Sequence, residues 1–149
     1  MSGSLTHSPQ DVIRYLMIDL TLGTAPSADA LWPIHVDNEP DLPDDCFTVY
    51  GTEGNGVGRT MVDGKKIVHH GIQIRVRAAS GRLGYIKARQ VAVSLDENVL
   101  RSTVTISGST YTVQSVDRTG DVIRLGKQKP SSERSLFTIN AVVSLRQLT

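Results

Sequence analysis

The sequence predicts an α+β fold, in which a mostly antiparallel sheet of about five or six strands carries two helices packed on one face. The first observation is a period-two alternation over residues 72–78, where apolar side chains point one way and Gln73, Arg75 and Arg77 point the other. The second is a helical period that begins after Ala79-Ser80-Gly81. One stripe then holds Gly84, Ala88, Val91, Ala92 and Leu95. Its small residues let a helix approach a sheet closely.

Size and composition are those of an ordinary globular chain. The 149 residues are 39% hydrophobic and 21% charged, which is enough to bury a core without cross-links. Cys46 is the only cysteine, so we expect neither a disulfide framework nor a CxxC metal site. The start has no signal-peptide pattern, and no run approaches about 18 apolar residues. We expect residues 1–7 to be a flexible leader and residues 8–149 a single domain.

The N-terminal half is predicted to hold one helix and two strands. Ser8-Pro9 starts the helix as N-cap and first helical residue, and Gly23 is its expected stop. The helix is apolar around most of its circumference, which favours burial against a partner as well as in the core. Residues 34–36 and 46–50 are predicted strands, and the proline-punctuated acidic segment 37–45 between them is a predicted loop.

The glycine-rich segment 51–64 invites comparison with phosphate-binding loops. A P-loop needs Gly-x4-Gly-Lys-Ser/Thr leading into a helix, but Arg59 stands where the lysine would be, and a strand follows. We therefore expect a hairpin tip or a loop that becomes ordered on assembly.

The C-terminal half is predicted to be all strand. Residues 103–107 and 110–116 form a hairpin around Gly108-Ser109. Residues 121–125 form a further short strand. The apolar, uninterrupted run 135–145 predicts a central strand of the sheet.

Several segments resemble, in order, a family of bacteriophage tail-completion proteins that includes the tail terminators of long-tailed phages. These segments are Pro43-Asp-Asp-Cys-Phe-Thr-Val-Tyr50, Gly71-Ile-Gln-Ile-Arg-Val-Arg-Ala78, Gly84-Tyr-x-Lys-Ala88, Gly120-Asp-Val-Ile-Arg-Leu-Gly126 and Leu136-Phe-Thr-Ile-Asn140. Phe47 departs from the family pattern, which has an aliphatic residue there. The resemblance covers roughly residues 10–146, and none of its segments is a catalytic motif.

The resemblance implies a structural virion protein at the head-proximal end of the tail. Such proteins assemble as a ring, usually a hexamer, terminate the tail tube and join it to the head-completion (neck) proteins. The expected partners are thus further copies of the chain, the tail-tube protein and a head-completion protein, with possible passing contact to DNA in the lumen and no membrane. Assembly would take place in the host cytoplasm, and the virion would be the final location.

Charge is unevenly distributed although the net charge is only +1. Residues 1–50 carry eight acids and one base, whereas residues 51–94 carry eight bases and two acids. Opposite-signed regions suit head-to-tail association of like subunits, but they can equally neutralise each other within one fold. The residues expected at a subunit or partner interface are Asp37, Asp41, Asp44, Asp45, Arg59, Lys65, Lys66, Arg75, Arg77, Lys127 and Lys129.

Arg75 and Arg77 are the centre of that expectation. In a ring, their face would meet either the acidic loop of a neighbouring subunit or the lumen. We favour the neighbour, because Thr112, Gln114 and Thr138 on adjoining strands are neutral, whereas a lumen would call for more bases.

Other functions find less support in the sequence. The adjacent His69 and His70 point to opposite faces of a strand and do not have zinc-ligand spacing. No nucleophile elbow is present, so we expect no enzyme, no catalytic residue, no metal and no cofactor. The alternatives kept open are a neck or head-completion ring protein and a small nucleic-acid-binding module. The second would use a basic face of Arg75, Arg77, Arg82, Lys87 and Arg89, although only Tyr85 is interleaved as an aromatic.

Overall fold

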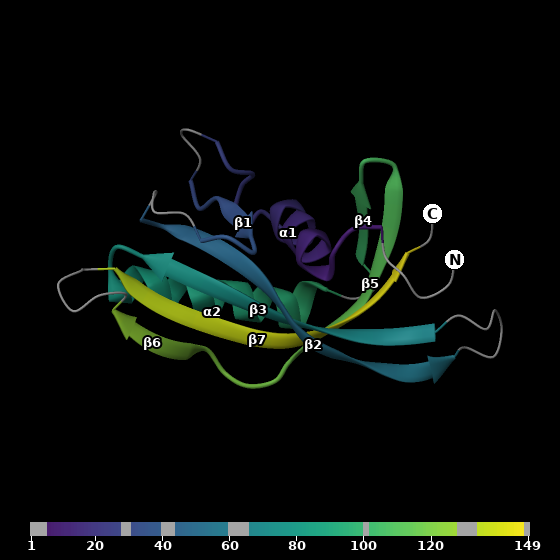
Figure 1. Ribbon diagram of the computed structural model, residues 1–149. Helices are drawn as coiled ribbons and strands as arrows, with labels where there is room; N and C mark the ends of the chain where they lie inside the picture. Colours follow the sequence, from purple (N-terminus) through teal and green to yellow (C-terminus); the bar gives the residue numbers. More distant parts are fainter. Residues whose placement is uncertain are drawn as a thin grey trace.

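The computed structural model describes residues 6–27, 31–39, 44–59, 66–99, 102–127 and 134–147. Two helices and a curled, mixed sheet make up the fold (Figure 1). The elements in chain order are α1 (Pro9–Asp19), β1 (Ile34–Val36), β2 (Cys46–Arg59), β3 (Lys66–Ala78), α2 (Gly81–Asn98), β4 (Ser102–Ile106), β5 (Ser109–Arg118), β6 (Ile123–Lys127) and β7 (Ser135–Gln147). The predicted α+β class is confirmed.

The sheet has seven strands among the described residues, more than the five or six expected. Its order is β1-β2-β3-β7-β5-β4, and β6 pairs with β7 beyond the end of β5. All pairings are antiparallel except that of β1 with β2, which is parallel. The central position predicted for residues 135–145 is confirmed, because β7 pairs with β3 on one side and with β5 and β6 on the other.

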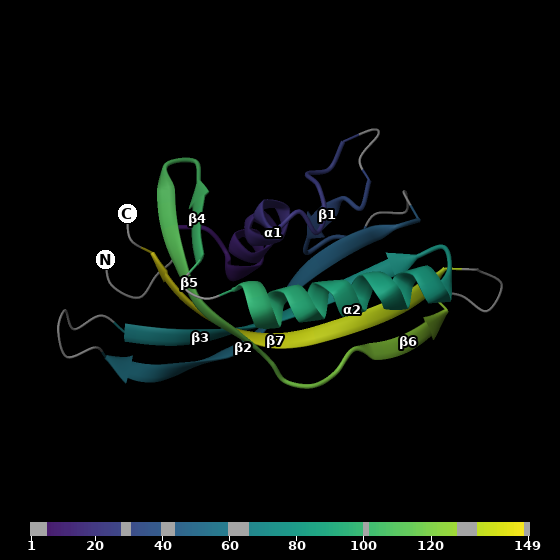
Figure 2. The same ribbon diagram turned by 180° about the vertical axis from the view of Figure 1, so that it is seen from behind.

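The two helices pack against different parts of the curled sheet. α2 lies along β3 and β7 and reaches β5, whereas α1 lies in the curl between β1 and β4 (Figures 1 and 2). Strand twist accumulates into this curl, so the expectation that both helices pack on one face is only partly matched. Side chains from both helices and from the strands form a single buried cluster.

Gly84 sets how closely α2 approaches the sheet. A Cβ built on this glycine would lie 2.7 Å from Cε2 of Phe137 and 3.0 Å from Cβ of Ala78. The helix therefore rests directly on β3 and β7 at this point, as its small-residue stripe predicted. Ala88, Val91, Ala92 and Leu95 of the same stripe are buried.

α1 begins as predicted and ends early. The Ser8 side chain accepts a hydrogen bond from the backbone N–H of Asp11 at 3.2 Å, and Pro9 is the first helical residue. The helix stops at Asp19, four residues before Gly23, because Thr21 takes a left-handed conformation with φ of 59°. The apolar surface of α1, which favoured a partner, lies instead in the chain's own core through Val12, Ile13, Leu16 and Met17.

Three other expectations need correction. The first part of the glycine-rich segment is not a loop, because β2 continues through Gly51 to Arg59 alongside β3. The β4–β5 turn lies one residue earlier than predicted, at Ser107-Gly108, where both residues have positive φ. The end of the expected flexible leader is anchored, since His7 N donates to the Tyr111 hydroxyl at 2.9 Å.

Candidate subunit interface

The arginines singled out in the sequence lie on the face of β3 opposite its buried Ile72, Ile74 and Val76. Arg75 and Arg77 pair in register with Thr48 and Cys46 of β2. Arg77 is only 1% exposed, and its Nε donates to the backbone carbonyl of Asp44 at 3.2 Å. A charged side chain so deeply buried is a structural part of the fold.

The described ends of the acidic segment, residues 37–39 and 44–45, contact these arginines within the same chain. An Oε2 of Glu39 lies 3.5 Å from Nη1 of Arg75, with the two side chains 15% and 30% exposed. A carboxylate oxygen of Asp44 accepts from Nε of Arg134 at 2.7 Å. The carboxylate of Asp45 accepts from the backbone N–H of Ala79 at 2.9 Å, which fixes the segment to the end of β3.

The structure thus supports the alternative in which the acidic and basic regions neutralise each other within one fold. Arg75 also lies over the Tyr50 ring, with 5.3 Å from Cζ to the centroid. Within the described residues, Arg77 is buried and Arg75, whose side chain is 30% exposed, is paired with Glu39 of the same chain.

Of the remaining predicted interface residues, the structure brings Arg59 and Lys66 together, as register partners of β2 and β3. Asp37 accepts from Nε2 of Gln10 on α1 at 3.1 Å, so it too is used inside the fold. Asp41, Lys65 and Lys129 lie outside the described residues. The backbones of three others lie at strand ends, while their side chains fall outside what the structure describes: Arg59, Lys66 and Lys127.

Burial controls the titrating groups beneath the acidic segment. It raises the pKa of the Cys46 thiol to about 11, which keeps this fully buried side chain protonated and unreactive. Burial also lowers the pKa of His35, and the positive charges of Arg14 and Arg77 lower it further. Both shifts favour neutral groups in a polar but covered layer.

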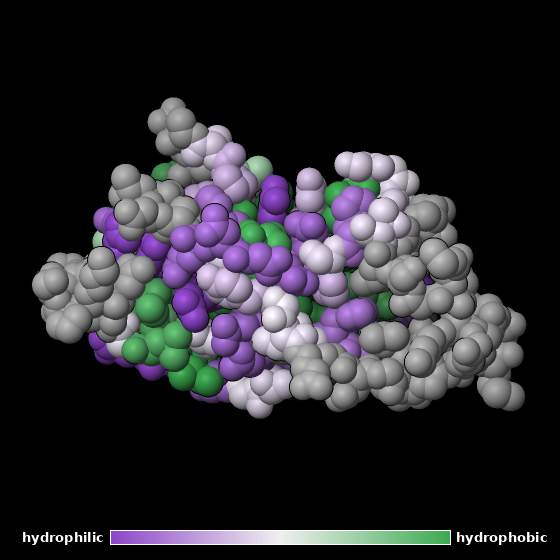
Figure 3. Space-filling view, viewed as in Figure 1, coloured by the Kyte–Doolittle hydropathy of each residue, from purple (hydrophilic) through white to green (hydrophobic). Residues whose placement is uncertain are grey.

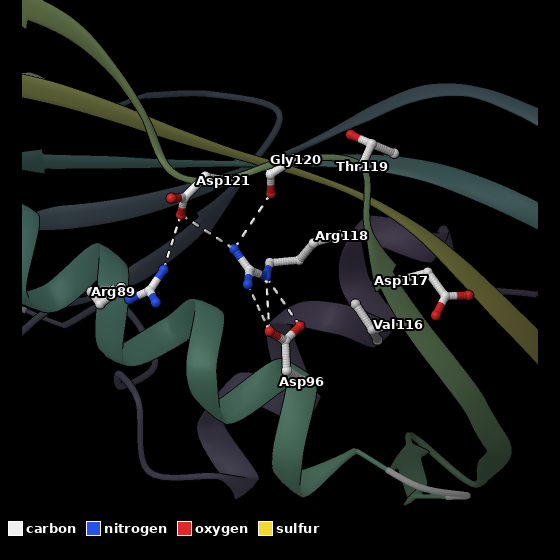
Figure 4. A pocket seen from close by; sticks show the side chains of 8 residues that line it. All are labelled: Arg89, Asp96, Val116, Asp117, Arg118, Thr119, Gly120 and Asp121. Carbon is white, nitrogen blue, oxygen red and sulfur yellow. Dashed lines mark hydrogen bonds and ion pairs between the residues drawn. The ribbon is translucent and has the colours of Figure 1, made fainter.

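A second charged cluster, which the sequence did not point to, lines a cleft of about 590 Å³ between α2 and the turn after β5 (Figure 4). Arg118 binds both carboxylate oxygens of Asp96, with the shortest distance 2.7 Å from Nη2. Asp121 lies 2.9 Å from Nη1 of Arg89 and 3.6 Å from Nη1 of Arg118.

The charges in this cleft are directed at one another. The backbone N–H of Val122 lowers the pKa of Asp121, and the charges of Arg89 and Arg118 lower it further. The hydrogen bond to Asp96 raises the pKa of Arg118. The cluster therefore ties α2 to the β5–β6 connection. Sequence periodicity could not find it, because the two pairs that join α2 to this connection, Arg89 with Asp121 and Arg118 with Asp96, are 32 and 22 residues apart.

Comparisons with known proteins identify no family. No family model matches the chain, and no curated protein is similar to it. Fifteen solved chains are similar in structure. One of them shares 17% identity with a TM-score of 0.48, and the match covers 96% of this chain and 99% of the other. A likeness of this size carries no argument about function.

The basic residues considered for nucleic acid do not share a face. Arg75 and Arg77 lie under the acidic segment, and Arg89 pairs with Asp121. The Lys87 ammonium lies over the Trp32 ring at 5.4 Å from the centroid, and burial lowers its pKa. No continuous basic surface with stacking aromatics results from this arrangement.

Apolar side chains, by contrast, are exposed on one edge of the sheet. Ile123 and Leu125 of β6 are each 48% exposed. Figure 3 shows an apolar patch at the lower left, where Figure 1 places β6. We call these two residues the edge patch. β6 pairs only with β7 among the described strands, so its outer edge has backbone groups available for pairing.

Neither a metal-binding cluster nor a membrane-spanning helix occurs among the described residues. No group of three or more His, Cys, Asp or Glu side chains there could hold a metal ion. No described helix has the length and apolarity needed to cross a membrane.

Proposed function

We propose that this chain is a structural virion protein that forms a ring at the head-proximal end of a phage tail. In that role it terminates tail-tube polymerisation and joins the tail to the head-completion proteins. The motivation from sequence is the ordered resemblance to tail-completion proteins over residues 10–146. The observation that carries the proposal is that β6 and part of β2, on opposite sides of one sheet, have outer edges without a described strand partner, and that β6 also bears the edge patch.

Open edges on opposite sides suit a ring because ring contacts are heterologous. Each subunit must offer two different surfaces that fit each other, and the rotation between subunits must close. β6 supplies one edge. β2 supplies the other, because β1 pairs only with Phe47, Thr48 and Val49 and leaves the outer edge of β2 beyond them without a described strand partner.

In the proposed ring, the edge patch of each subunit packs beside β2 of the next subunit. Burial of the edge patch removes apolar surface from water, and strand pairing satisfies the open backbone groups of both edges. The acidic segment and its arginines do not form the contact; they hold the β2–β3 face rigid within each subunit. This assignment replaces the neighbour contact expected for Arg75 and Arg77.

Assembly can be tested by the mass of the purified protein in solution, alone and with tail-tube protein, together with electron micrographs. We expect rings from the wild-type chain and no rings from an Ile123→Asp/Leu125→Asp double variant, because charges at the edge patch oppose both burial and pairing. Thr105→Asp is the matched control, on the exposed face of β4, and should still form rings. A wild-type chain that stays monomeric in both settings would refute the proposal.

A further inference from the structure

The outer surface of α2 carries an apolar stripe that the fold leaves in solvent. Leu83, Ile86 and Val93 are 48%, 54% and 36% exposed. They lie with Gln90 and Glu97 on the side of the helix opposite the stripe that packs on β3 and β7. A helix of this kind, apolar on two opposite sides, is typical of one that is buried on both.

The charges along α2 are reversed with respect to its dipole. The first turn has no acidic residue and contains Arg82, and the last turn has no basic residue and contains Glu97. Both charges are exposed, and neither forms a hydrogen bond or ion pair with another described residue. Arg89 and Asp96 on the same helix are already paired, with Asp121 and Arg118. Arg82 and Glu97 thus each lie at the unfavourable end of their own helix.

The stripe is nearly symmetric about Gln90. Leu83 and Glu97 lie seven residues before and after it, and Ile86 and Val93 lie four before and three after. An antiparallel copy of α2 centred at this position would place Ile86 near Val93 of the other copy. Glu97 would lie level with Leu83 and beside Arg82 of the other copy. Each unpaired charge would then meet an opposite charge and the opposite helix end.

We propose that α2 is a two-fold contact surface, on which α2 of a second copy of this chain packs in antiparallel orientation with Gln90 at the axis. The self-complementary charges select this occupant, because an unrelated helix has no reason to carry the same reversed pattern. The contact is isologous, whereas ring contacts are heterologous, so it stands independently of the proposed function.

Disulfide crosslinking tests the geometry directly. In a Gln90→Cys variant the two new thiols face each other across the axis, so mild oxidation should give a covalent dimer. In a Glu97→Cys variant the thiols lie about 21 Å apart, since seven residues on each helix separate them from the axis, and no disulfide should form across the dimer. Cys46 is fully buried and does not contribute. No dimer from Gln90→Cys, or equal rates for both variants, would overturn the proposal.

Charge exchange tests the pairing without added thiols. Arg82→Glu and Glu97→Arg should each raise the dimer dissociation constant about tenfold, because both symmetry-related pairs become repulsive. The Arg82→Glu/Glu97→Arg double variant should restore the wild-type value. Ring formation through β6 should be unaffected in all three. Single variants that bind like the wild type, or a double variant no tighter than the singles, would contradict the antiparallel pair.

Discussion

Replacing Arg77 by alanine should lower the free energy of unfolding by about 3–5 kcal/mol. The guanidinium is almost fully buried, and its Nε–H binds the Asp44 carbonyl. Alanine would leave that carbonyl without this donor and would open a space beneath the acidic segment. Urea denaturation followed by circular dichroism measures the change.

Arg82→Ala is the matched control for this effect. Arg82 is a solvent-exposed arginine that pairs with no described residue, so its loss should change stability by no more than about 0.5 kcal/mol in the monomer. Equal effects of the two substitutions would show that the acidic segment does not cover Arg77 in solution. The same measurement bears on Arg75→Glu/Arg77→Glu, which we expect to unfold the subunit before any effect on assembly could be seen.

Phe137→Ala should destabilise the protein by a similar amount, about 3–5 kcal/mol. Phe137 lies at the centre of the sheet on β7 and supports α2 where Gly84 brings the helix closest. The Tyr85 ring packs edge-on against it with centroids 6.2 Å apart. A cavity here removes the support of α2 and lowers the melting temperature by about 10 °C.

Leu125→Ala serves as the comparison, because this residue is also a large apolar side chain on a strand but is half exposed. Its loss should cost less than about 1 kcal/mol in the monomer. Calorimetry of the two variants compares the stability lost in the core with the stability lost at the sheet edge. A Phe137→Ala protein as stable as Leu125→Ala would mean that α2 does not rest on β7.

The sequence predicted most elements because their periodicities are local. The alternation over residues 72–78 and the small-residue stripe around Gly84 both appear in the structure, as do the Ser8 cap and the central β7. Local composition alone gave one wrong prediction. Glycine content suggested a loop at residues 51–59, but pairing with β3 holds that stretch in β2, since register with a neighbour overrides weak propensity.

The candidate interface was harder to predict because it depends on packing between distant segments. The sequence shows acidic residues at 37–45 and arginines at 75 and 77. It does not show whether these opposite charges pair within one subunit or between two. Pairing of β2 with β3 brings them together in one subunit, because Cys46 and Thr48 lie in register with Arg77 and Arg75. Two exposed apolar surfaces could not be predicted, because the sequence does not distinguish exposed from buried apolar residues and exposure depends on the packed fold. They are formed by Ile123 with Leu125 and by Leu83 with Ile86.

Tail-tube length is the most direct test of the proposed function. Tube protein is polymerised alone and with increasing amounts of this chain, and tube lengths are measured in electron micrographs. We expect shorter tubes as the chain is added, each ending in a ring at one end, and no shortening with the Ile123→Asp/Leu125→Asp variant. If tube length stays unchanged and no rings appear at tube ends at every amount of wild-type chain tested, the proposed function is wrong.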